Sequence, residues 1–129
     1  MDALDWLNAH VTGLIGQRAR MAGRERTAEL VGLVVRHWPH NHLDAIQRAG
    51  GKNHVAVRHA MALVRAQVRE HYEARHGVGP LWNLFLAGFV ASISQAVVEL
   101  WFGDASWRVI LRGLSRQIAA GDLPKKSQE

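Results

Sequence analysis

The sequence predicts an all-α fold, a single-domain bundle of about six helices. Apolar residues recur every three or four positions along most of the chain, which is the spacing of one helix face. No stretch alternates apolar and polar residues between turn signals, as a half-buried strand does. A chain of 129 residues, 48% of them apolar, is long enough for one hydrophobic core and not for two. We expect this domain over residues 1–121, followed by a polar tail over residues 122–129.

Three helices are expected in the first part of the chain. The first covers residues 2–21, where apolar side chains fall three or four positions apart. The second covers residues 25–38 and is stopped by Pro39, because proline lacks the N–H that a helix interior needs. A short third helix over residues 43–49 is closed by two consecutive glycines.

Three further helices follow. The fourth is long and amphipathic, over residues 53–76, with Asn53 as its N-cap because this side chain can accept from a first-turn amide. A Gly-Val-Gly-Pro hinge then leads into the fifth helix, residues 81–102, since proline suits the first turn of a helix. The sixth helix has Asp104 or Ser106 as its N-cap and ends near a glycine and a proline.

The fifth helix is the most informative segment, because Glu99 is its only charged residue. Its 22 residues are enough to span a bilayer core of ~30 Å at about 1.5 Å per residue. Ser92, Ser94 and Gln95 place polar groups in its middle, and no second apolar segment accompanies it, so we expect no membrane span. We expect the helix to be enclosed by its own domain on one side and by a partner helix on the other.

Small and polar side chains on one face of this helix indicate a close pairing between two copies of the chain. This face carries Gly88, Ser92, Gln95 and Glu99. The sixth helix would join the fifth as a helical hairpin, and its apolar stripe consists of Trp107, Leu111, Leu114 and Ile118. Two such hairpins make a four-helix interface, so we expect a homodimer.

The charge balance is basic, with a formal net charge of +5 and 13 arginines among the 16 basic residues. The arginines are spread along the chain, so they do not by themselves predict a nucleic-acid interface. The chain has no cysteine, which excludes disulfides and thiolate metal sites. Its first residues lack the basic and apolar regions of a secretory signal, and we expect a cytoplasmic protein.

Residues 40–104 follow a distinctive order: a short helix ending in glycine, a long amphipathic helix, a Gly/Pro hinge, and an apolar helix ending in tryptophan and glycine. The stretch is HNHLDAIQRAGGKNHVAVRHAMALVRAQVREHYEARHGVGPLWNLFLAGFVASISQAVVELWFGD, and ASWRVILRGLSRQIAAG follows it. In this order it resembles the C-terminal regulatory domain of the TetR family of transcriptional repressors. The resemblance implies that the last two helices form a dimer interface and that the interior holds a small inducer. In that family a DNA-binding helix-turn-helix precedes this domain, so we expect contact with DNA only through a module that this chain lacks.

An inducer of this kind would lie among aromatic and soft side chains around the core. The candidates for this ligand site are Trp6, Trp38, His59, Met61, Trp82 and Phe85. His59 is the expected polar contact, because it lies beside the apolar stripe of the fourth helix. We therefore expect a regulatory domain that binds a small apolar effector, with no metal, no cofactor and no enzymatic activity. In the alternative, a stand-alone protein-interaction module, the same side chains would be core packing and the interior would be solid.

A second alternative places DNA binding inside the chain. Residues 43–66 would then form a small helix-turn-helix, with the two glycines at the turn. His54, Arg58 and Arg65 would lie on the reading helix. Against this, the helix they occupy is much longer than a typical reader.

Histidines give two further patterns. His37, His40 and His42 have a spacing that can supply imidazole ligands to zinc or nickel, but the segment lacks a complete ligand set. The Arg65–His71 and Arg69–His76 spacings are similar to the Arg and His pair of HEPN-type ribonucleases. Such pairs arise readily by chance in a chain with 13 arginines and 8 histidines, so we expect no ribonuclease activity. For His37, His40 and His42 we expect a solvated turn and no metal site.

Overall fold

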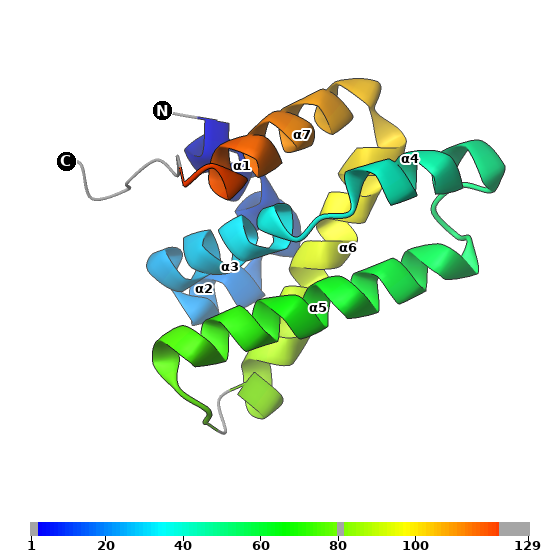
Figure 1. Ribbon diagram of the computed structural model, residues 1–129. Helices are drawn as coiled ribbons and strands as arrows, with labels where there is room; N and C mark the ends of the chain where they lie inside the picture. Colours follow the sequence, from blue (N-terminus) through cyan, green and yellow to red (C-terminus); the bar gives the residue numbers. More distant parts are fainter. Residues whose placement is uncertain (1–2, 80–81, 122–129) are drawn as a thin grey trace.

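The computed structural model describes residues 3–79 and 82–121 and shows an all-helical bundle, which confirms the predicted fold class (Figure 1). Within these ranges the chain forms seven α-helices and one π-helical turn. They are α1 (Ala3–Ile15), α2 (Gln17–Ala22), α3 (Arg24–Arg36), α4 (His40–Ala49), α5 (Val55–His76), η1 (Trp82–Leu86), α6 (Ala87–Gly103) and α7 (Ala105–Ala119). The expected polar tail, residues 122–129, and the expected start of the fifth helix at residue 81 lie outside the described residues.

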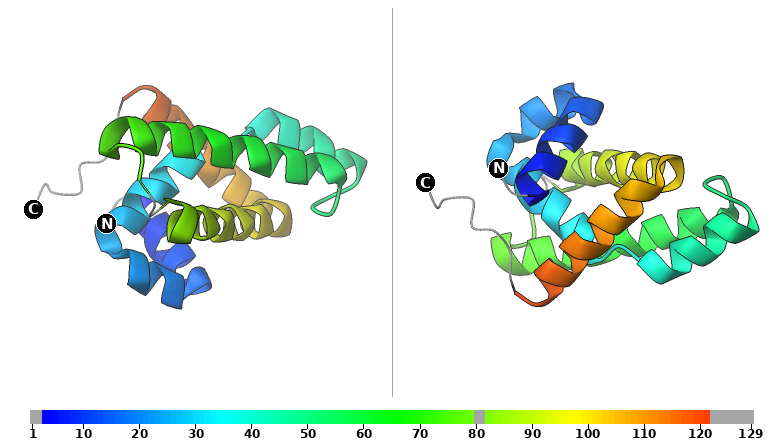
Figure 2. Two further views of the ribbon diagram at one scale, coloured as in Figure 1. Left: turned by 90° about the horizontal axis from the view of Figure 1, so that it is seen from below. Right: turned by 90° about the horizontal axis from the view of Figure 1, so that it is seen from above.

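Helix α6 runs through the middle of the bundle (Figure 1). It contacts α1, α3, α5 and α7, and Figure 2 shows α5 and α6 side by side, running in opposite directions. The side chains that it buries completely are Phe89, Val90, Ile93, Ser94, Val97 and Trp101. The apolar segment is therefore enclosed mainly by helices of its own domain. In residues 3–79 and 82–121, no helix has both the length and the apolarity that crossing a membrane requires.

Gly16 divides the expected first helix into α1 and α2. Its φ of 56° lies in the left-handed region, which glycine adopts at no steric cost, so the chain changes direction there. The apolar spacing continues across this break, because Ala19 of α2 is buried in the same core as Val11 of α1. For this reason the periodicity alone did not reveal the turn.

Two N-caps differ in how well the sequence predicted them. His54, not Asn53, caps α5: its Nδ1 accepts from the Ala56 N–H at 3.1 Å. The prediction of Asn53 was wrong, because α5 begins at Val55, one residue later than a cap at Asn53 requires. Asp104 caps α7 as one of the two expected residues, accepting from the Ser106 N–H at 2.9 Å. This hydrogen bond, together with a second one from the Ser106 hydroxyl, lowers the pKa of the Asp104 carboxyl.

A polar cluster is buried where α4 meets α6 and α7. The centroids of the His40 and Trp101 rings lie 5.2 Å apart. The Trp38 ring packs against the same indole, with 6.1 Å between the centroids. Arg112 pairs with Asp44 and lies over Trp101. Burial, followed by the charges of Arg112 and Arg116, lowers the pKa of His40 to about 4. His40 is therefore neutral in the folded protein at physiological pH.

This lowered pKa makes stability depend on pH. Between about pH 4 and pH 6.5 the unfolded chain binds a proton at His40 that the folded chain does not. Stability is therefore complete above pH 6.5 and falls as the pH drops towards 4, by on the order of 1–2 kcal/mol once solvent screening of the partly exposed ring is allowed for. Urea denaturation across this range measures the loss, and His40→Gln should flatten it. His42→Gln, at an exposed neighbour on α4, is the control, and an equal pH dependence in both variants would contradict the assignment.

Candidate functional site

An open cleft of ≈ 1170 Å³ lies between α3 and the C-terminal end of α5, and we refer to it as the α3–α5 cleft. Its walls also include Leu4, Asp5 and Asn8 of α1, Ala22 of α2, Ile118 of α7, and Gly23. A smaller pocket of ≈ 530 Å³ shares Asp5, Asn8, Gly23 and Arg24 with it. Ligand sites typically occupy about 300–1,000 Å³, so the cleft is large enough for a small molecule.

Helix α3 supplies the floor of the cleft with one face and the protein core with the other. Its cleft face carries residues three or four positions apart, namely Glu25, Ala28, Glu29, Gly32, Leu33 and Arg36. Its opposite face buries Leu30, Val31, Val34 and Val35 without exposed surface. The core side fixes the position of the helix, so the cleft side can carry polar groups without contributing to packing.

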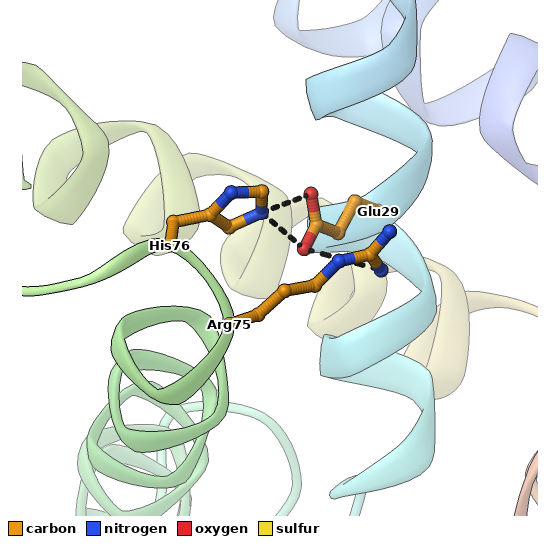
Figure 3. A network of polar contacts seen from close by, with 3 residues as sticks. All are labelled: Glu29, Arg75 and His76. Carbon is orange, nitrogen blue, oxygen red and sulfur yellow. Dashed lines mark hydrogen bonds and ion pairs between the residues drawn. The ribbon is translucent and has the colours of Figure 1, made fainter.

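Glu29 is the centre of the polar network in the cleft (Figure 3). The His76 Nε2 atom donates to it, lying 3.0 Å from Oε1 and 2.8 Å from Oε2. The Arg75 guanidinium lies 3.7 Å from the same carboxylate. The network ties the last turn of α5 to α3, and it leaves Glu29 with cationic or donating partners on one side.

A second contact joins the same two helices further along. The His37 and His71 rings lie 4.6 Å apart, and burial, followed by the charges of His71 and Arg36, lowers the pKa of His37. Helices α3 and α5 are therefore held together at the Glu29–His76 pair, at the His37–His71 pair and where the Arg26 guanidinium lies over the Tyr72 ring. Gly32 and Ala74, which both line the cleft, fall between these points in the sequence of their helices.

Gly32 is unusual among the twelve glycines, all of which lie in the described ranges, because it alone is buried. A Cβ built on Gly32 would meet no other atom within 4 Å. Glycine in a helix interior costs about 1 kcal/mol relative to alanine, so some compensation is expected where it occurs. At Gly32 no close packing of another helix provides this compensation. The space above this turn of α3 is open.

Two arginines that line the cleft have no ion-pair partner among the described residues, whereas its carboxylates all have interactions. Arg24 and Arg36 make no ion pair with any described residue, whereas Glu29 is paired with His76. The other two carboxylates of the cleft, Asp5 and Glu25, each have interactions of their own. The cleft is therefore suited to a ligand that carries negative charge.

The structure does not gather the six ligand-site candidates around this cleft, and none of them lines it. Trp6 is exposed and stacks on Trp107 at 4.9 Å, and His59 is exposed. The other four are buried or half-buried: Trp38, Met61, Trp82 and Phe85. Among the described residues no ring contact joins two of the six. Their role in ligand binding stays a prediction.

The sequence analysis did not single out Glu29, Gly32, Arg36 or Arg75. Two signals pointed towards them. A glycine stands inside the amphipathic second helix, and charged residues follow the same helical spacing on its polar face. His71 and His76 were noted for their spacing from arginines, but Arg65 and Arg69 do not line the cleft.

The eight residues expected at the dimer interface divide into two groups. Those of α6 lie at or near the surface: Gly88, Ser92, Gln95 and Glu99. Arg18 of α2 donates to the Gly88 carbonyl at 2.9 Å and to Ser92 Oγ at 2.7 Å. Those of α7 are buried within the single chain: Trp107, Leu111, Leu114 and Ile118. The α6 face is therefore available to a partner, and the dimer stays a prediction.

Glu99 ends this face of α6 in a small polar network. Its carboxylate accepts from Lys52 Nζ at 2.6 Å and from Gln95 Nε2 at 3.0 Å. The hydrogen bond from Lys52 is the main reason that the pKa of Glu99 is lowered. The two ends of the α6 face are thus bound by Arg18 of α2 and by Lys52 of the loop before α5.

The two alternatives from histidine and turn patterns gain little from the structure. Helices α4 and α5 run side by side in opposite directions (Figures 1 and 2), whereas the helices of a helix-turn-helix cross at about 90–120°. His37 and His40 lie against different rings, His71 and Trp101. Within the described part of the chain, no three His, Asp or Glu side chains are arranged to hold a metal ion.

Comparison of the chain with protein-family models, curated proteins and solved structures found no match. The function is therefore argued from the cleft and from the α6 face.

Replacing Gly32 with alanine should stabilise the free protein. The added Cβ enters open space and removes backbone freedom from the unfolded chain, so the free energy of unfolding should rise by about 0.5–1 kcal/mol. Urea denaturation measures this change. Gly113→Ala, in the interior of α7 and also without a neighbour within 4 Å, is the matched control. A loss of stability in Gly32→Ala alone would show that the space is filled.

Replacing Glu29 with glutamine should loosen the end of α5. The amide keeps the shape of the side chain but loses the charge that holds His76 and Arg75, at a cost of about 0.5–1.5 kcal/mol. Amide hydrogen exchange should accelerate first in the last turn of α5. Glu70→Gln, at an exposed position of the same helix, serves as control. The network would have no structural role if both variants exchanged at the same rate.

Proposed function

We propose that the chain is the ligand-binding and dimerisation domain of a regulator, of the kind that its resemblance to the TetR family implies. The observation that carries the proposal is the α3–α5 cleft, with a buried glycine at its floor and unpaired arginines at its rim. A ligand site needs space and a few convergent polar groups, and the cleft offers both. The effector would occupy this surface cleft instead of an apolar cavity inside the core.

The arrangement of α3 supports a link between ligand and dimer. Helix α3 lines the cleft and contacts α6 and α7 directly. A ligand that draws α3 and the end of α5 together would shift the helices that support the α6 face, and this differential contact is what allosteric coupling requires. The proposed partner is a second copy of the chain, DNA is reached only through a separate module, and the proposed compartment is the cytoplasm.

A stand-alone protein-interaction module is the second candidate. It is favoured by the openness of the cleft to solvent and by its volume of ≈ 1170 Å³, which exceeds that of most small-molecule sites. In this case a segment of another protein would fill the cleft. A small molecule that binds tightly to the isolated chain distinguishes the two, because an interaction module has no need of one.

The dimer surface is tested by Gly88→Leu. In the single chain a Cβ on Gly88 meets only the Arg18 side chain, at 3.4 Å, so the variant should fold, while its bulk should prevent close approach of a second α6. Sedimentation at micromolar concentration should show a dimer for the unaltered chain and a monomer for this variant. Gly13→Leu, at an exposed position of α1 where an added Cβ has no neighbour within 4 Å, should stay dimeric. A dimer that survives both Gly88→Leu and Ser92→Glu does not use this face.

The ligand site is tested by a thermal-shift screen of small molecules against the unaltered chain and Gly32→Phe. Compounds that bind the cleft should raise the melting temperature of the unaltered chain and leave that of the variant unchanged, because the added ring fills the space above α3. If every stabilising compound acts equally on both proteins, the ligand site lies elsewhere.

A further inference from the structure

The α3–α5 cleft carries its free charge at one end. Gly32 and Arg36 are four residues apart on α3, which places them on one face, one turn apart. His71 belongs to the same end, because it also lines the cleft and its ring lies 4.6 Å from that of His37, the residue after Arg36. The open space above Gly32 is thus one helical turn from an arginine and close to a histidine.

At the other end of the open space, the carboxylate that could bind a cationic group already has partners. Glu29 lies three residues before Gly32 and is bound by His76, with Arg75 nearby. A ligand cation would have to displace these groups to reach the carboxylate. An anionic group meets Arg36, whose guanidinium has no ion-pair partner among the described residues and presents donors in a fork that matches a carboxylate or phosphate.

Apolar side chains also line the cleft. They are Leu4, Ala22, Ala28, Leu33, Ala74 and Ile118, from α1, α2, α3, α5 and α7. Such a surface favours a hydrocarbon or ring, and removing it from water contributes about 25 cal/mol per Å². An extended polyanion is disfavoured, because Asp5, Glu25 and Glu29 also line the cleft.

Resting on the proposed function, we propose that the cleft binds a small organic anion, with its oxyanion at Arg36 and His71 and its apolar body across Gly32 and Ala74. Arg36 recognises the charge, and Gly32 provides the space for the body.

Three probes of equal length separate charge from apolar contact: hexanoate, 1-hexanol and hexylammonium, with inorganic phosphate as the headgroup alone. Binding to the full chain is measured by isothermal titration calorimetry. Hexanoate should bind roughly tenfold or more tightly than each of the other three, because a hydrogen bond to a charged group is stronger than one between neutral groups. If 1-hexanol binds as tightly as hexanoate, the proposed recognition of an anion is wrong. If phosphate binds as tightly as hexanoate, the proposed contact with an apolar body is wrong.

Variants assign the binding to the cleft. Arg36→Gln, at an exposed position that should leave the fold intact, is expected to weaken hexanoate roughly tenfold and leave 1-hexanol unchanged. Arg58→Gln, exposed on α5 and outside the cleft, should change neither. Gly32→Leu should weaken both probes. Hexanoate binding that is insensitive to Arg36→Gln, or absent at millimolar concentration, overturns the proposal.

These outcomes distinguish this proposal from the proposed function. If Gly32→Leu weakens 1-hexanol while Arg36→Gln has no effect on hexanoate, the cleft is a ligand site for an uncharged molecule and only the anion is wrong. If neither variant alters the binding of any probe that binds, both proposals fail together.

Discussion

The burial of α6 is the constraint on which the rest of the bundle depends. This helix carries a single charged residue, Glu99, and its Phe89 and Trp101 side chains have no exposed surface. At about 25 cal/mol per Å² of apolar surface, leaving such a helix in water would cost more than a domain of this size can recover. Helices α1, α3, α5 and α7 therefore all contact it. Each of them has one face committed to α6 and the core, and only the opposite face is free for another role.

The α3–α5 cleft follows from this division of faces. Leu30, Val31 and Val34 hold α3 in the core, so its outer side need not pack against anything. Contacts at Glu29–His76 and His37–His71 bring α5 close at two points. The small residues Gly32 and Ala74 lie between them and do not fill the gap. Because Gly32 and Ala74 are small and the contacts between α3 and α5 lie on either side of them, the helix pair leaves a recess without any loss to the core.

The fold was predictable to the extent that it depends on apolar spacing. The spacing placed the helices and identified the segment of α6, but it continued through Gly16, where a backbone turn and not a side-chain pattern divides α1 from α2. The cap of α5 was misplaced by one residue because histidine can accept at its Nδ1 atom as asparagine does at its amide oxygen. The candidate cleft was harder to predict. It depends on which residues of α3 and α5 face one another, and that register is set by tertiary contacts such as Glu29–His76 and not by either helix alone.

The stack of Trp6 on Trp107 provides the protein with an internal optical signal. The two indoles lie 4.9 Å apart and are inclined by only 14°, close enough for their electronic transitions to couple. Trp6 belongs to α1 and Trp107 to α7, and both helices also contribute residues to the walls of the α3–α5 cleft. Any movement of one wall relative to the other changes the geometry of the pair. Near-ultraviolet circular dichroism of the unlabelled protein therefore reports on movement of α1 relative to α7.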